Sequence, residues 1–311
     1  MIFGIEENTN SIETISESMI GTQEELLSIL SEGLNNIFQI RTQILKESIS
    51  IEERYINDEI TINESSIILE SSFGEKIEAA KAVLSNLKDK FIAWVTKMIT
   101  NLKLFISNYE NFIKKNKEKI EELKNSGKKV SIKIYDIDGG SKFVDDLLVE
   151  SRNTINDICR LSDKAFRGNN EKMDELMEYI EESDVLLTDS NDIIQELNII
   201  INKNEQPQEM DIPVDMIINQ MQNTKNILKR FESYKKEFEK SSTNAIKTLS
   251  MDAVKNMNNL ADMENGMQGY SYALASVTVL LTHVPKVIFH LCETNKRATL
   301  EYLRILKDAL K

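Results

Sequence analysis

Two aspartates at the end of a candidate strand are the side chains with the clearest potential for chemistry. Asp136 and Asp138 lie at and just after the end of the alternating stretch KVSIKIYDI, residues 129–137. Two carboxylates at this spacing could supply a nucleophile and an acid, or bind calcium. The calcium loop fails because its fifth position is Gly140 and its twelfth is Leu147. A nucleophilic aspartate would need a parallel sheet to orient it, and no further strands that could form such a sheet are predicted, so we expect a strand-end turn.

The other reactive side chains also lack the partners that chemistry would require. His283 and His290 are seven residues apart, on one face of a continuous helix, but no third ligand lies nearby. Cys159 and Cys292 are too few for a disulfide framework and show no metal-ligand spacing, so reduced core residues are expected. Phosphate-binding loops, dinucleotide fingerprints, zinc signatures and nucleophile elbows are all missing. The sequence therefore predicts that the chain is not an enzyme and has no catalytic, cofactor-binding or metal-binding residues.

The charge of the chain is concentrated in its first 70 residues. Residues 1–70 hold 14 acidic and three basic side chains, a net charge of −11 out of a total of −13. Residues 75–142 carry 15 lysines and nine acidic side chains, so we expect the acidic segment to cover this lysine-rich region. The acidic balance argues against sequence-specific binding of nucleic acid. The lysine-rich stretch 114–133 is expected to make at most non-specific contact with DNA.

The elements that must position these side chains are predicted to be helices. Within residues 75–125, apolar residues recur at steps of three and four, which is a heptad pattern. Its buried positions are expected to be Leu84, Leu87, Phe91, Trp94, Met98, Leu102, Phe105, Tyr109 and Phe112. A second apolar stripe runs from Leu26 to Leu45, and Gly74 is expected to break the chain between the two helices. Further helices are predicted at 141–166, 170–182, 184–203, 213–240, 243–264, 270–283 and 286–310.

Together these patterns predict an all-α fold. We expect a long-helix bundle with coiled-coil-like packing and at most one small strand pair around 129–137, with the isoleucine-rich segment 49–69 as the candidate partner strand. The predicted regions are an acidic N-terminal segment at 1–70, a helical body at 75–203 and a C-terminal helical region at 213–311. The proline-containing turn 204–213 is the predicted linker.

One apolar run, residues 272–291 with the sequence YALASVTVLLTHVPKVIFHL, is long enough to span a membrane. It contains two histidines, Pro285 and Lys286. A buried helix, a kink at Pro285 and a second amphipathic helix are therefore expected, and membrane contact is not.

A short motif recurs in the acidic segment. The triplet of Ile or Leu, any residue and Glu ends at Glu7, Glu17, Glu32, Glu47, Glu53, Glu64 and Glu70. This triplet resembles the sites cut by prohead proteases of large tailed bacteriophages, which remove acidic propeptides during maturation. Residues 85–138, in which a Trp-containing aromatic helix runs into a lysine-rich end and a short strand, resemble a segment common in virion proteins of such phages. The resemblance singles out Ile68, Leu69, Glu70 and Ser71 as the candidate processing site.

The resemblance implies both a function and a location. It implies a non-enzymatic structural or internal protein of a phage virion, made in the bacterial host cytoplasm, with other virion proteins or copies of itself as partners. Removal of residues 1–70 would leave a nearly neutral body that tolerates packing beside DNA. The alternative is a cytoplasmic helical interaction or scaffold protein that binds partner helices through its bundle and is not associated with a virion.

Overall fold

A computed structural model describes residues 24–46, 49–50, 62–124, 126–165, 170–202, 206–249 and 260–310. Its labelled helices are α2 (Ile62–Lys115), α3 (Lys117–Lys124), α4 (Ile137–Ala165), α5 (Asn170–Glu182), α6 (Asp184–Leu187), α7 (Ser190–Ile201), α8 (Val214–Thr248) and α9 (Leu260–Ala309). A further helix covers residues 24–46. In the described residues the strands are β1 (Lys129–Ile132) and β2 (Gln208–Asp211). The predicted fold class, an all-α bundle with one small strand pair, is confirmed.

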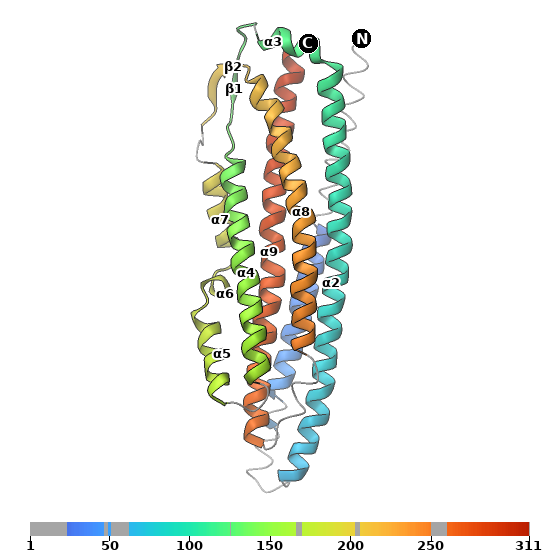
Figure 1. The fold of residues 1–311 in the computed structure, drawn as a ribbon, viewed down its shortest axis with the longest axis vertical. Helices are drawn as coiled ribbons and strands as arrows, with labels where there is room; N and C mark the ends of the chain where they lie inside the picture. The colour runs from blue at the N-terminus through green and yellow to red at the C-terminus, as the bar shows by residue number, and fades with distance from the viewer. Residues whose placement is uncertain are drawn as a thin grey trace.

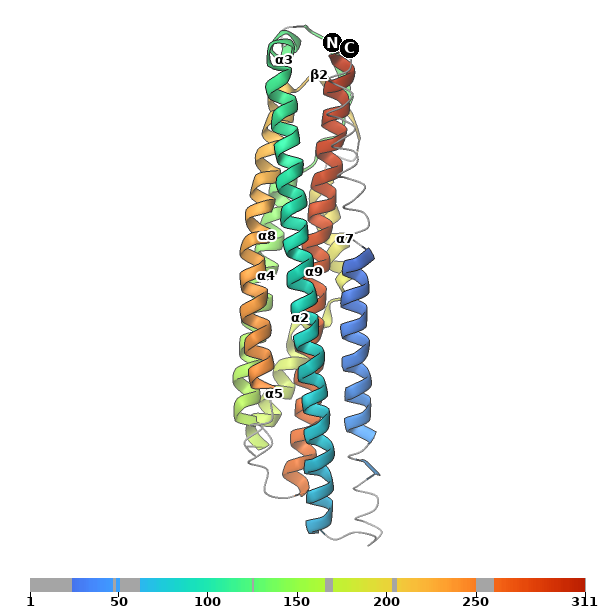
Figure 2. The same cartoon turned by 90° about the vertical axis from the view of Figure 1, so that its right-hand side faces the viewer.

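The long helices lie side by side and give the molecule the shape of a rod (Figure 1). α2, α4, α8 and α9 run along the long axis, and the shorter α5 and α7 pack against α4 and α9. The helix of residues 24–46 lies alongside α2 and α9, on the side away from α8 (Figure 2). Because α9 contacts α2, α4, α5, α7 and α8, it is the central helix of the bundle.

The heptad pattern of α2 explains how the core is built. All nine apolar positions predicted from Leu84 to Phe112 are buried. Trp94 is 2% exposed, and its ring centroid lies 5.7 Å from that of Phe289 on α9. Phe91 lies 4.2 Å, centroid to centroid, from Phe238 on α8. The aromatic rings of α2 therefore connect it to both neighbouring long helices.

Four predicted helix breaks are wrong. Gly74 lies inside α2, and α9 continues through both the break predicted between 264 and 270 and the one predicted at Pro285. The break predicted between 240 and 243 is also wrong, because α8 continues to Thr248. A glycine inside a helix costs only about 1 kcal/mol relative to alanine. Burial of the apolar side chains of α2 from Phe73 to Phe112 outweighs that local preference.

Two other predicted helices are each divided. The helix expected over 75–125 ends as α2 at Lys115, and α3 follows after Asn116, whose side-chain amide donates to the Phe112 carbonyl at 2.8 Å. The helix expected over 184–203 is divided into α6 and α7. Asp189 begins α7 by accepting a hydrogen bond from the Asn191 backbone N–H at 2.7 Å. Side-chain capping produces both divisions without a glycine or proline.

The strand pair has a different partner from the one predicted. β1 is antiparallel to β2, with Lys129 opposite Asp211 and Ile132 opposite Gln208. β1 therefore pairs with a strand in the predicted linker 204–213. The prediction that segment 49–69 supplies the partner strand was wrong. β1 also ends at Ile132, before the predicted end at 137. Each strand shortly precedes a long helix, so the packing of α4 against α8 brings the two strands together.

The hydrophobic core extends through all three predicted regions. Its main cluster combines residues of the 24–46 helix with residues of α2, α4, α5, α7, α8 and α9. The 24–46 helix contributes Leu26, Leu30, Ile37, Ile40 and Ile44. A second cluster lies near β1 and β2 and includes Phe105, Tyr109 and Tyr302. Independent folding of any one region stays a prediction.

Candidate functional site

The candidate processing site lies in a helix. Ile68, Leu69, Glu70 and Ser71 fall within α2, which begins at Ile62. Their side chains lie outside the described residues. Proteolytic cleavage concentrates at exposed loop tips and chain ends. A cut after Glu70 is therefore predicted to require local unwinding of α2.

Asp136 and Asp138 lie at the start of helix α4. The prediction that they form a turn at the end of a strand was therefore wrong. Asp136 precedes α4, and its Oδ1 accepts a hydrogen bond from the Gly139 backbone N–H at 2.8 Å. The Asp136 backbone N–H donates to the Ile201 carbonyl at 2.9 Å. Asp138 lies in the first turn of α4, where a negative charge interacts favourably with the helix dipole. Asp136 is thus an N-cap, which satisfies a backbone donor of the first turn.

Both thiols are confirmed as free, buried core residues. Cys159 lies on α4 and Cys292 on α9. Burial raises the pKa of the Cys159 thiol to about 11 and that of Cys292 to about 12. Because the thiolate is the nucleophile and the metal ligand, these thiols are poorly suited to either role at neutral pH.

The two histidines face different surroundings on α9. Burial lowers the pKa of both His283 and His290, so both are held neutral near pH 7. His290 Nε2 lies 2.8 Å from Oδ1 of Asn198 on α7, which fits a proton on Nε2. His283 Nδ1 is buried and has no hydrogen-bond partner among the described residues. No three or more His, Cys, Asp or Glu side chains of the described part of the chain are grouped to hold a metal ion.

The lysine-rich stretch 114–133 forms one end of the rod, where α3 and β1 lie (Figure 1). Lys124 pairs with Asp215 at 2.7 Å, and Lys128 Nζ donates to the Ala309 carbonyl at 3.2 Å. Five further lysines are exposed, namely Lys114, Lys115, Lys117, Lys119 and Lys129. Non-specific contact of this end with DNA stays a prediction.

The 24–46 helix, which carries three glutamates of the N-terminal segment, lies beside lysines of α2. Glu25 pairs with Lys97, and Glu32 pairs with Lys90, each at 2.7 Å. Next to the Glu32–Lys90 pair the helices approach closely, because a Cβ added at Gly33 would come within 3.0 Å of a Leu87 methyl group. For these residues, the expected covering of the lysine-rich region by the acidic segment is confirmed.

A layer of buried polar side chains joins α8 to α9. Gln220 Nε2 donates to Asn295 Oδ1 at 2.8 Å, and Asn295 Nδ2 donates to Thr224 Oγ1 at 3.0 Å. Thr299 completes the layer, with its hydroxyl donating to the Asn295 carbonyl at 2.8 Å. Sequence reasoning missed this layer. The sequence does contain an indication of this layer. Polar residues recur four positions apart within two otherwise apolar stripes, at 220 and 224 and at 295 and 299.

A groove follows the line where α4 packs against α8. Arg230 donates to the Asp145 carboxylate from Nε at 3.0 Å and from Nη2 at 2.9 Å. Seven residues further along both helices, Arg152 Nη1 lies 3.9 Å from Glu237 Oε2. Equal steps of seven are typical of a parallel coiled-coil contact. Between the two ion pairs lies a cavity of about 240 Å³, with a smaller cavity of about 30 Å³ beside it toward α9.

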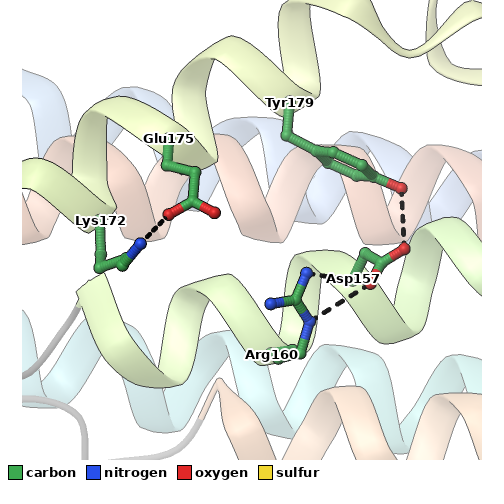
Figure 3. A network of polar contacts seen from close by, with 5 residues as sticks. All are labelled: Asp157, Arg160, Lys172, Glu175 and Tyr179. Atoms are coloured by element: carbon green, nitrogen blue, oxygen red, sulfur yellow. Dashed lines mark hydrogen bonds and ion pairs between the residues drawn. The ribbon is translucent and has the colours of Figure 1, made fainter.

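A second polar cluster joins α4 to α5 (Figure 3). The Tyr179 hydroxyl donates to Asp157 Oδ2 at 3.3 Å, and Arg160 Nη2 donates to Asp157 Oδ1 at 3.3 Å. Lys172 pairs with Glu175 within α5. Burial raises the pKa of Tyr179, so its hydroxyl stays protonated and can donate. The arrangement fixes the packing of two helices, and each charged group in it faces an opposite charge.

An acidic cavity of about 200 Å³ lies between α4, α6 and α7. Its carboxylates belong to Asp146, Glu150, Asp184 and Glu196. They are not among groups able to hold a metal ion in the described residues. This cavity is therefore a weaker candidate for a binding site than the groove between α4 and α8.

One helix in the described part of the chain is long and apolar enough to cross a membrane, over Gly266–Ala309. Its most apolar window is 72% buried inside the bundle. The central position of α9 therefore accounts for its apolar composition.

Comparison with known proteins found no matching family model, no matching curated protein and no matching solved structure.

Proposed function

We propose that the chain is a non-enzymatic structural or internal component of a phage virion, with other virion proteins or copies of itself as partners. The glutamate triplets and the resemblance of residues 85–138 support the virion setting. The structural observation that supports a structural role is that the side chains capable of chemistry are engaged in packing. Asp136 caps α4, Cys292 is buried, and His290 contacts Asn198.

The contact between the 24–46 helix and α2 supports a role in assembly. Glu25 and Glu32 hold lysines that would otherwise be free to attract phosphates or acidic partners. In a virion protein this covering would limit premature association. The exposed lysines at the 114–133 end would remain available for non-specific contact with packaged DNA.

Processing after Glu70 would not release the 24–46 helix by itself. Leu26, Leu30 and Ile37 are each 0% exposed in the main core, so the cut helix would stay bound through its apolar face. Release would require a partner that competes for the same face of α2 and α9. Cleavage would then allow a new partner to replace the 24–46 helix. That partner would cover the apolar face that the helix leaves exposed.

The test is mass spectrometry of purified phage particles. We expect the chain to remain with the particles through a density gradient, at a fixed ratio to the main head protein. If residues 1–70 are a propeptide, the first residue found should be Ser71. Recovery of the chain from the soluble lysate alone, and none from particles, would reject the proposal.

The alternative, a cytoplasmic protein that binds partner helices, is favoured by the same helix contact. The face of α2 that holds the 24–46 helix accepts an amphipathic helix with glutamates opposite Lys90 and Lys97, so a partner helix of that pattern would fit there. Particles free of the chain, together with a soluble complex of fixed composition, would favour this function.

A further inference from the structure

The groove between α4 and α8 combines a charged rim with an apolar interior. The rim holds the pairs Asp145–Arg230 and Arg152–Glu237, and the outer cavity of about 240 Å³ lies between them. The inner cavity of about 30 Å³ is lined mostly by apolar side chains. These include Leu148, Ile155, Phe238, Leu280, Leu281 and Val284. Leu148, Arg152, Tyr234 and Glu237 line both cavities, so the two are adjacent.

Two polar atoms of the inner cavity have no hydrogen-bond partner among the described residues. One is Oγ of Ser151, a residue only 4% exposed, and the other is Oε2 of Glu237. The Glu237 side chain as a whole is 44% exposed, so one carboxylate oxygen points inward while the rest reaches solvent. Native proteins rarely leave a buried polar atom without a partner, a water or a ligand.

The geometry points to a binding site for a small primary alkylammonium ion in this groove. The ammonium head lies in the inner cavity, at Glu237 Oε2 and Ser151 Oγ. The alkyl chain extends into the adjacent outer cavity, along Leu148, Val149 and Tyr234. An ammonium group offers three N–H donors and no acceptor, which matches a carboxylate oxygen and a hydroxyl oxygen that both lack a donor. At roughly 30 Å³ for a water-sized group, the outer cavity admits a chain of several methylene groups.

The charges of the rim favour a cation over an anion. Arg230 is already engaged by both oxygens of Asp145, whereas the inward oxygen of Glu237 has only a distant cation. The 3.9 Å between Arg152 Nη1 and Glu237 Oε2 is too long for a hydrogen bond. The Arg152 side chain is 42% exposed, so it can turn to solvent when an ammonium binds. Exposed pairs of this kind contribute little stability.

The experiment is a titration of the full chain with n-butylammonium chloride, followed by NMR of leucine and valine methyl groups at constant ionic strength. We expect saturable shifts at Leu148, Val149 and Val284, with a dissociation constant in the millimolar range because the ligand is small. n-Butanol, which has the same chain without the charge, should bind at least about tenfold more weakly, since charge-assisted hydrogen bonds are the stronger ones.

Matched variants test the assignment to Glu237. Glu237→Gln should weaken n-butylammonium binding about tenfold, and Ser151→Ala should weaken it less. Glu239→Gln, an exposed carboxylate on the same helix, should leave binding unchanged. Arg152→Gln should keep or raise the affinity, because it removes a competing cation.

Three results would overturn the proposal. An absence of saturable methyl shifts would mean that the inner cavity holds water alone. Equal binding of n-butanol would mean that the groove recognises only apolar chains. Unchanged affinity in Glu237→Gln, with methyl spectra that report an intact fold, would place the ammonium elsewhere.

Discussion

The side-chain amide of Gln220 donates to Oδ1 of Asn295 at 2.8 Å across the interface between α8 and α9, where both residues are buried. A slide of one helix by a turn would leave both amides unpaired in an apolar environment. Buried polar pairs are known to specify register in packed helices. We infer that this pair specifies how α8 and α9 align.

Gln220→Leu should destabilise the chain by about 1–3 kcal/mol, because it leaves Asn295 Oδ1 buried without a donor. The double variant Gln220→Leu/Asn295→Leu should recover part of that loss, since both polar groups are then removed. Urea unfolding measures the free energies. Gln222→Leu, at an exposed position of the same helix, should change stability by no more than about 0.5 kcal/mol. A double variant less stable than Gln220→Leu would contradict the assignment.

Trp94→Ala should lower the free energy of unfolding by about 3–5 kcal/mol, because Trp94 is 2% exposed among rings of three helices. The matched control is Leu104→Ala on the same helix, where the side chain is 50% exposed and the cost should stay within about 0.5 kcal/mol. In the parent protein, Trp94 emission should shift to longer wavelength on unfolding. A solvent-exposed emission wavelength in the folded state would argue against this core.

The chain 71–311 should be much less stable than the full chain. Its loss of Leu26, Leu30, Ile37 and Ile44, each 0% exposed, uncovers apolar surface on α2 and α9. Thermal unfolding and binding of a hydrophobic dye to 71–311 measure the effect. A cooperative transition within a few degrees of the full chain would instead support a separable arm.

Ion pairs should contribute little to that difference. Lys90→Gln/Lys97→Gln removes both contacts to the 24–46 helix, and each exposed pair is worth about 0.2–1 kcal/mol. The variant should therefore lose less stability than the truncation and show a weaker dependence on salt. A loss as large as that of 71–311 would mean that charge, and not apolar burial, holds the helix.

Stability should fall as the pH drops below about 6.5, the ordinary histidine pKa. Burial lowers the pKa of His283 in the folded state, so the unfolded chain takes up a proton first. The stability contribution is full above the unfolded pKa and decreases toward the lower folded pKa. Urea unfolding at pH 7.5 and pH 5.5 should show a smaller difference for His283→Gln than for the parent. An equal difference would exclude His283 as the source.

Both thiols should resist a thiol reagent in the native protein at pH 8. Burial raises the pKa of Cys159 and Cys292 to about 11 and about 12, so little thiolate forms and access is blocked. Ellman's reagent should detect both thiols only after denaturation. Rapid reaction of either thiol before unfolding would show that its surroundings open.

Long-range periodicity made the helices predictable, while their ends followed tertiary packing. The nine heptad positions from Leu84 to Phe112 were predicted because a long helix repeats its signal over many turns, whereas the buried Phe73, Ile77 and Ala80 of the same helix were not predicted. The bounds predicted for α5, 170–182, agree with Asn170–Glu182. Gly74 and Pro285 carry strong local signals for a break, but burial of the surrounding helix overrides them.

The groove site and the strand pair depend on contacts that a single sequence does not reveal. Ser151 and Glu237 come together only because α4 packs beside α8. The polar residues of β2 show no strand pattern, and β2 forms because β1 lies opposite it. A partial signal existed in the charges: Asp145 and Arg152 are seven apart on one helix, as Arg230 and Glu237 are on the other.

The strand pair has a mechanical consequence for the rod. α4 follows one end of the pair and α8 follows the other, so the two helices start at different heights. Asp145 lies eight residues beyond the start of α4 and Arg230 sixteen beyond the start of α8, a difference of about 12 Å of helix. Four residues of strand span about 13 Å, which accounts for the offset at which the two side chains meet. A pulling force along the rod would have to shear the strand hydrogen bonds before α4 and α8 could slide, so both helices would carry the load together.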